Sequence, residues 1–189
     1  MINKFIFVIS FALLGLMKPF VVFGVDTRLA TQDISLQVAG SALLAVTGPP
    51  VVMKMAGASE AGDAISQAIE NSDSRLRISS LVSGEEVRAI TAKISEALVG
   101  TQLYVELQAP NSNFGNPEMM GTLKGLRLMS NELEEMIVEG IGTCWSGKTD
   151  GDGYIIRYSF KAIPGATIMK SANITITYTI SLVPSDASE

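Results

Sequence analysis

The run NITITYTISL, residues 173–182, decides the fold class. Its apolar side chains recur at every second position, at Ile174, Ile176, Tyr178 and Ile180, with threonine between them. Successive side chains of a β-strand point to opposite faces, so this pattern predicts a strand with one buried face and one face in water. Threonine and isoleucine favour the same conformation because branched side chains pack well on a pleated surface. The run therefore predicts one strand of a sheet that is covered on one side.

The same alternation recurs along much of the chain. Clusters of Gly, Pro, Asn and Asp separate the alternating stretches, for example at 47–50, 111–117 and 150–153. Many short strands without long helices between them predict an all-β fold. We expect an antiparallel immunoglobulin-like β-sandwich with at most one or two short helices. The other alternating positions are Leu76 and Ile78; Ile90, Ala92 and Ile94; Leu103, Val105 and Leu107; and Ile156, Tyr158 and Phe160.

Two segments do not fit this simple pattern. Residues 61–70 space their apolar side chains as a helix would, but they also allow a strand with Ile65 and Ile69 on one face. Residues 131–139 begin with Asn and have Glu three positions later, which is a helix-capping pattern, and they end at Gly140. We expect this second segment to form a short helix or a turn that crosses between sheets.

The first 24 residues have the composition of a secretory signal peptide. Lys4 precedes an apolar run from Phe5 to Leu16, and small residues stand before a cleavage point after Gly24. The run is shorter than the about 20 apolar residues that a membrane-spanning helix needs. We therefore expect export to the periplasm, the cell surface or the medium, with no membrane span after cleavage. Residues 25–183 are expected to form a single β-sandwich domain, and residues 184–189 a disordered tail.

The composition disfavours several kinds of chemistry. The chain has no histidine and one cysteine, Cys144. Without histidine there is no Ser–His or Cys–His catalysis, and most zinc and copper sites lose their usual ligand. A net charge of −5 argues against nucleic acid as a partner, because a phosphate backbone needs a basic surface. We expect Cys144 to be a small buried residue rather than a reactive thiol or an intermolecular bridge.

The segment GTCWSGKT, residues 142–149, matches the phosphate-loop pattern G-x-x-x-x-G-K-[ST]. A working phosphate loop is followed directly by a helix whose first amides hold the phosphates. Here the run DGDG at 150–153 follows and favours a hairpin turn. The match is therefore interpreted as a coincidence, and no cofactor is expected. The same run resembles the start of a calcium loop, but Tyr154 and Lys161 stand where later ligands are needed, so no metal site is expected.

Two further groups of residues could form a site. Trp145 and Tyr154 could provide an aromatic platform for sugars, although a tryptophan beside Cys144 is more often a core residue. A carboxylate cluster, as in glycoside hydrolysis, could form from Asp150 or Asp152 together with Glu132, Glu134, Glu135 and Glu139. Clustered acids are more often a solvated face. No catalytic residue is therefore assigned, and we expect a protein that is not an enzyme.

The layout of the chain resembles that of exported bacterial β-sandwich proteins of the pilin and adhesin kind. The shared features are the signal peptide, an early strand at 33–38, many short strands and the closing strand rich in Thr and Ile. The segment GIGTCWSG, residues 140–147, is also similar to a group of uncharacterised secreted bacterial proteins. The resemblance implies a subunit whose early strand, with Ile34, Leu36 and Val38 on one face, completes the sheet of a neighbouring copy. Chaperone-assembled pilins commonly have an internal disulfide, which a single cysteine cannot form.

These features lead to two functional expectations. The first is an exported, non-enzymatic structural or adhesin-like subunit of a bacterial surface or extracellular assembly, with other proteins or copies of itself as partners. The alternative is a module that binds carbohydrate or another small ligand through Trp145 and Tyr154.

Overall fold

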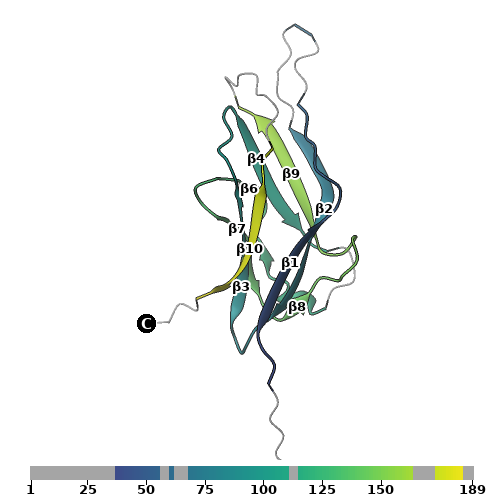
Figure 1. Cartoon of the computed structure of the whole chain (residues 1–189), viewed down its shortest axis with the longest axis vertical. Helices are drawn as coiled ribbons and strands as arrows, with labels where there is room; N and C mark the ends of the chain where they lie inside the picture. Colours follow the sequence, from purple (N-terminus) through teal and green to yellow (C-terminus); the bar gives the residue numbers. More distant parts are fainter. Residues whose placement is uncertain (1–36, 56–59, 62–67, 111–114, 164–172, 185–189) are drawn as a thin grey trace, which may run out of the picture. The chain divides into compact units, whose positions relative to one another are not determined.

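A computed structural model describes residues 37–55, 60–61, 68–110, 115–163 and 173–184. Every described strand belongs to one compact unit that begins at Val38. These strands form two antiparallel sheets that pack face to face as a β-sandwich (Figure 1). The predicted all-β sandwich is confirmed at this level. The helical element in the described part is a single 3₁₀ turn, Pro117–Met119, at a place where none was predicted.

The larger sheet contains six described strands in the order β1-β2-β9-β4-β6, with β8 also paired to β2. Strand β2 pairs with β1 through its second half, and on its other side with β9 and then β8. It is therefore the strand that ties this sheet together. The bounds are β1 Ser41–Thr47, β2 Ile69–Leu81, β4 Thr101–Gln108, β6 Arg127–Leu128, β8 Cys144–Trp145 and β9 Tyr154–Ala162.

The smaller sheet has four described strands in the order β10-β3-β7-β5. From β2 to β8 every step along the chain crosses from one sheet to the other, and the step from β9 to β10 crosses again. The two layers are therefore joined many times by the chain itself. The bounds are β3 Val87–Ile94, β5 Thr122–Leu123, β7 Glu135–Ile141 and β10 Ile176–Val183.

The core lies between the sheets and contains the side chains that alternation selected. The predicted inward positions of β2, β3 and β4 are all at most 8% exposed. Ile156 and Tyr158 of β9 are also buried, and Phe160 and the alternating residues of β10 pack partly buried against this core. Alternation therefore located these five strands and their inward faces. The buried residues of β2, β3 and β4 are Leu76, Ile78, Ile90, Ala92, Ile94, Leu103, Val105 and Leu107.

The helix considered for residues 131–139 is wrong. The amides of Glu132 and Leu133 donate hydrogen bonds to the Ser130 hydroxyl at 3.1 and 3.3 Å, which forms a tight turn. Strand β7 then begins at Glu135. The turn leads from β6 in one sheet to β7 in the other, so the alternative of a turn that crosses between sheets is correct.

Several other expectations fall wholly or partly on residues outside the described ranges. The signal peptide, Ile34 and Leu36 lie there, as do residues 185–189 and most of residues 61–70. Val38 is described; it is exposed and precedes β1. Ile69 and Glu70 open β2, so the end of the ambiguous segment is a strand. Within the described ranges no helix is long and apolar enough to cross a membrane.

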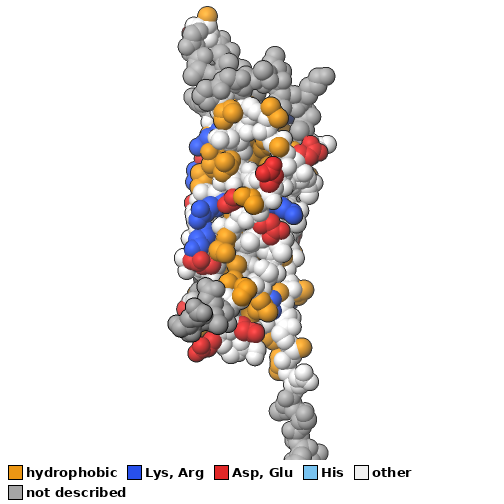
Figure 2. All heavy atoms as spheres, turned by 90° about the vertical axis from the view of Figure 1, so that its left-hand side faces the viewer, with side chains coloured by type: hydrophobic (Ala, Val, Ile, Leu, Met, Phe, Trp, Pro, Cys, Tyr) orange, Lys and Arg blue, Asp and Glu red, His pale blue; other side chains and the backbone are white. Residues whose placement is uncertain are grey.

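The surface on the side shown in Figure 2 mixes charges of both signs. Lys and Arg side chains lie near Asp and Glu, and hydrophobic side chains form scattered patches. Four ion pairs join described side chains: Lys93 with Glu134, Lys124 with Glu139, and Arg157 with both Glu70 and Glu106.

Candidate functional site

The edge of the sandwich formed by β1 and β10 is the first candidate site. Each is the outermost strand of its sheet, paired on one side alone among the described strands. The two strands contact each other and lie side by side in Figure 1. An outer strand leaves a row of unpaired N–H and C=O groups, which can pair with another extended chain. We call this region the open edge.

Burial falls sharply on the core face of β1 at the open edge. Val46 is directly opposite Leu76 in the antiparallel register, so both side chains point to the same face of the sheet. Leu76 is fully buried, whereas Val46 is 52% exposed. A large apolar side chain therefore faces the interior of the sandwich without being covered.

Strand β10 shows the same gradient on the opposing sheet. Ile176, Tyr178 and Ile180 are opposite the buried residues Ile94, Ala92 and Ile90 of β3, yet they are only partly buried. The Tyr178 hydroxyl donates a hydrogen bond to that of Tyr158 at 3.2 Å, which anchors its polar end inside. Burial raises the pKa of Tyr178. The core face of both outer strands is thus apolar and incompletely covered.

Trp145 was expected to be a core residue because it stands beside Cys144, but this expectation is wrong. It is 54% exposed on β8. Its backbone pairs with Gly115 through hydrogen bonds of 2.9 and 3.4 Å, and its ring lies over that glycine. A Cβ at Gly115 would come within 2.1 Å of the ring, so the absent side chain is what allows this packing. Trp145 therefore presents its ring at the surface in a supported position.

Tyr154 does not join Trp145 in an aromatic platform. It is 1% exposed, and its hydroxyl donates a hydrogen bond to the backbone carbonyl of Met120. The pKa of Tyr154 is raised, mainly because its hydroxyl is buried and to a smaller extent because of its electrostatic interaction with Cys144. A side chain in this position cannot offer its ring to a ligand, so the platform is reduced to Trp145.

In the segment that matches a phosphate loop, the backbone amide of Thr149 is already hydrogen-bonded to another residue. The Thr149 amide donates to the Asp152 carboxylate at 2.8 Å, and the Asp152 amide donates to the Thr149 carbonyl at 3.0 Å. A turn at 150–151 follows, and then strand β9 begins. The helix that would hold phosphates is replaced by this turn and strand. The turn does not form the expected hairpin either, because β8 and β9 both pair with β2 and not with each other.

Cys144 is 1% exposed within the core. Burial raises the pKa of its thiol to about 11. The thiolate is the nucleophilic form of cysteine, so a raised pKa makes the side chain unreactive near neutral pH. The expected role of Cys144 as a small buried residue is confirmed.

Two of the acidic residues in 132–139 are paired with cations on different strands. Glu134 accepts a hydrogen bond from the Thr91 hydroxyl at 2.7 Å and pairs with Lys93 at 3.6 Å. Glu139 pairs with Lys124 on β5's side of the sheet. In the described residues no three or more His, Cys, Asp or Glu side chains lie close enough to hold a metal ion.

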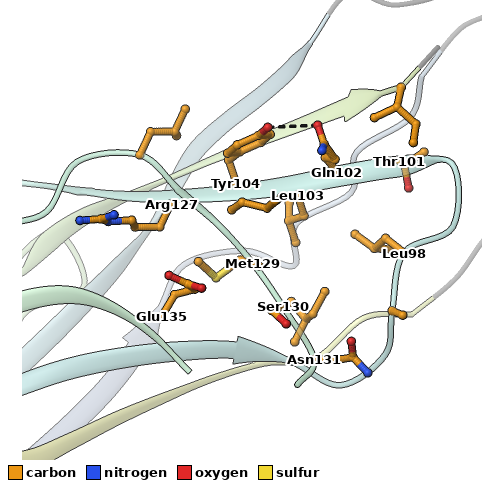
Figure 3. A pocket seen from close by; sticks show the side chains of 15 residues that line it. Leu98, Thr101, Gln102, Leu103, Tyr104, Arg127, Met129, Ser130, Asn131 and Glu135 are labelled. Carbon is orange, nitrogen blue, oxygen red and sulfur yellow. Dashed lines mark hydrogen bonds between the residues drawn. The ribbon is translucent and has the colours of Figure 1, made fainter. Parts of the chain in front are cut away.

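A pocket of about 680 Å³ opens between the start of β4 and the turn before β7. Figure 3 shows Tyr104 and Gln102 of β4 along one wall, joined by a hydrogen bond of 3.0 Å. Leu103 and Met129 among its lining residues are buried. The rim has one cation, Arg127, and one anion, Glu135, so its charge does not select a ligand.

No protein-family model matches the chain, and no curated protein or solved structure matches it significantly.

Reasoning from the sequence missed the open edge and the support for Trp145. Strand β1 reads SALLAVT, in which apolar side chains stand on both faces, so it gives no alternation. Gly115 and Trp145 are thirty positions apart, and no local pattern links them. The composition of β1 is nevertheless a usable signal. A strand with apolar side chains on both faces indicates that both faces are sites of contact.

Proposed function

We propose that the protein is an exported, non-enzymatic structural or adhesin-like subunit of a bacterial surface or extracellular assembly. It assembles by adding a strand from another copy at the open edge. The observation that carries this proposal is the incompletely covered apolar core face of β1 and β10. Filling it with an extended apolar segment buries surface and satisfies the unpaired backbone groups of β10.

The strand order supports an immunoglobulin-like interpretation of the sandwich. A constant-type immunoglobulin domain has one sheet with the order A-B-E-D and a second with the order G-F-C. In chain order, β1, β2, β4 and β9 correspond to A, B, D and E, because the sheet reads β1-β2-β9-β4. Strands β3 and β10 then correspond to C and F, and β5 to β8 are an insertion between D and E. The place of strand G is the side of β10 that has no described partner.

The segment 26–38 has the properties of the missing strand. Ile34, Leu36 and Val38 alternate with polar residues, so an extended segment presents three apolar side chains to one face. The segment precedes β1 in the chain, and its last residue, Val38, is 81% exposed. We propose that it pairs with the sandwich of a neighbouring copy. Added main-chain hydrogen bonds would supply affinity, and the alternating side chains would supply register.

Deleting residues 25–38 tests this mechanism. We expect the intact chain to form oligomers in size-exclusion chromatography and the truncated chain to remain monomeric. If the truncated protein still assembles, strand addition by this segment is wrong.

A synthetic peptide of residues 26–38 provides the second arm of the test. It should bind the truncated protein and raise its melting temperature by several degrees, because a ligand that binds only the folded state stabilises it. The matched control is the same peptide with Ile34→Asp and Leu36→Asp, which should give no shift. Equal shifts from both peptides would contradict the proposed register.

A further inference from the structure

The outer face of the larger sheet has an exposed apolar row beside unpaired cations. Ser79 of β2 is opposite Leu43 of β1 on one side and Trp145 of β8 on the other. Neighbouring strands are about 4.8 Å apart, so Leu43 and Trp145 stand about 10 Å from each other across the small serine. Leu43 is 67% exposed and Trp145 is 54% exposed. The three side chains therefore form a shallow platform on the surface.

Two cations lie along this platform. A depression of about 210 Å³ next to the row is lined by Leu43, Arg77, Ser79 and Lys148, among others. One guanidinium nitrogen of Arg77 donates to the Lys148 carbonyl, which fixes the two residues beside each other. We call Trp145, Ser79, Arg77 and Lys148 the outer-face patch.

Neither cation of the outer-face patch is neutralised by an acid within the described residues. Other cations are: Arg157 contacts Glu70 at 2.6 Å and Glu106 at 3.0 Å. Asp150, two positions after Lys148, makes no ion pair with either cation among the described residues. Within the described residues, a protein of net charge −5 therefore has two cations without an acidic partner on the same face of the sheet as its tryptophan.

We propose that the outer-face patch binds an acidic saccharide, a sugar chain that carries carboxylates. The apolar face of a sugar ring stacks on an exposed aromatic ring, as on Trp145. The carboxylate would reach Arg77 and Lys148, where charge-assisted hydrogen bonds are strong and the planar guanidinium matches the carboxylate.

The geometry favours a saccharide over a peptide strand. At Ser79, strand β2 is paired on both sides, by β1 and by β8, so this face offers no free edge for main-chain pairing. The ring of Trp145 is flat, exposed and supported from below by Gly115. A rigid aromatic surface flanked by cations suits a ring with a negative group at its rim.

Fluorescence titration of the purified protein with an oligogalacturonate tests the proposal. Trp145 is the only tryptophan in the chain, so its emission reports on this patch alone. We expect a saturable change in emission that weakens as NaCl is added. A neutral maltooligosaccharide of the same length should give at least tenfold weaker binding. No saturable change with the acidic sugar, or equal affinity for the neutral one, would overturn the proposal.

Substitutions show which residues carry the binding. Lys148→Ala and Arg77→Gln should each weaken the affinity by roughly tenfold, as expected for one charge-assisted contact. Lys148 is exposed, so Lys148→Ala should fold normally. It therefore still tests the proposal if Arg77→Gln fails to fold. Lys93→Ala, on the other sheet, is the matched control and should bind as the unaltered protein does. Equal loss in the Lys93 variant would contradict the assignment.

A poly-glutamate peptide of equal charge separates this proposal from simple ion attraction. We expect it to bind at least tenfold more weakly than the acidic sugar, because it cannot stack on Trp145. Trp145→Ala, followed by calorimetry, should remove the preference for the sugar. If poly-glutamate binds equally well, the patch is a docking surface for acidic proteins and the saccharide proposal is wrong.

Discussion

Tyr154 places a hydroxyl group in the interior, where it has one protein acceptor, the carbonyl of Met120. Tyr104 also donates its hydroxyl, to Gln102 at 3.0 Å, but it lies at the partly exposed wall of a pocket. The same chemical bond is therefore formed in two environments. A buried acceptor that loses its donor has no water to replace it, whereas a partly exposed one does.

Tyr154→Phe should lower the free energy of unfolding by about 1–3 kcal/mol, because it leaves the Met120 carbonyl buried without a donor. Tyr104→Phe removes the same atom at the surface and should change the stability by less than about 0.5 kcal/mol. Urea unfolding of both variants checks this. Equal effects would mean that the Met120 carbonyl finds another partner.

Gly115→Ala should displace the ring of Trp145, since the added methyl would stand within 2.1 Å of it. Because the ring belongs to an exposed side chain that can turn aside, the loss of stability should be small, below about 1 kcal/mol. The emission maximum of the single tryptophan should shift at the same time. Gly151→Ala, where a Cβ meets nothing within 4 Å, is the control and should leave both quantities unchanged.

Cys144 should make stability depend on alkaline pH. Its pKa is raised from 9.0 to about 11 in the folded protein. Between these values the unfolded chain has lost the proton and the folded chain has kept it, so stability is full below pH 9 and falls as pH rises toward 11. The slope is at most about 1.4 kcal/mol per pH unit for one group. Urea midpoints from pH 7 to 10 measure it, and Cys144→Ala should flatten the curve below pH 10.

At the scale of the strand, sequence alternation works where one face is buried and the other is wet. It located β2, β3, β4, β9 and β10 because their large apolar inward residues recur at every second position. Strand β7 breaks that rule: Ile137 and Val138 are adjacent and both buried, because the register with β3 shifts there. A bulge places an extra residue in one strand, and a pattern with period two cannot represent it.

The other missed strands have different causes. Strands β5, β6 and β8 are two residues long, too short for any periodic pattern. The capping signature near Asn131 reflects a real turn, but the hydroxyl that accepts the amides belongs to Ser130. At the candidate sites, Trp145 can be identified from the sequence as a ligand residue, whereas its support by Gly115 and the position of Arg77 near Lys148 depend on contacts between distant segments.

Hydrogen exchange should distinguish the two outer strands from the inner ones. In the protein that lacks residues 25–38, the β10 amides that point to β3 should be protected from exchange. The alternate β10 amides, which face the open edge, should exchange quickly. In assembled intact protein both sets should be protected. Uniform protection of β10 in the truncated protein would show that its outer side is already paired.

At the scale of the whole molecule, nearly every pairing joins strands that are far apart in the chain. Ile90 is opposite Ile180, and Ile69 is opposite Phe160. Contacts between distant residues require large loops to close before they contribute energy, and this slows folding.

Refolding from urea should therefore take milliseconds to seconds, as in other all-β sandwiches. Stopped-flow fluorescence of Trp145 measures the rate. A dominant phase in microseconds would contradict the idea that distant strand pairs form the rate-limiting contacts.

The two strands of the open edge, β1 and β10, are also the first and last described strands of the chain. Tension applied along a fibre would enter each sandwich through these two strands. It would load the seven residues of β1 against β2 and the eight residues of β10 against β3 before it reached the middle of either sheet. Under load β1 and β10 would detach first and the subunit would lengthen, while β2, β9 and β4 stayed paired. The two strands would pair again when the tension is released, so the extension would be reversible.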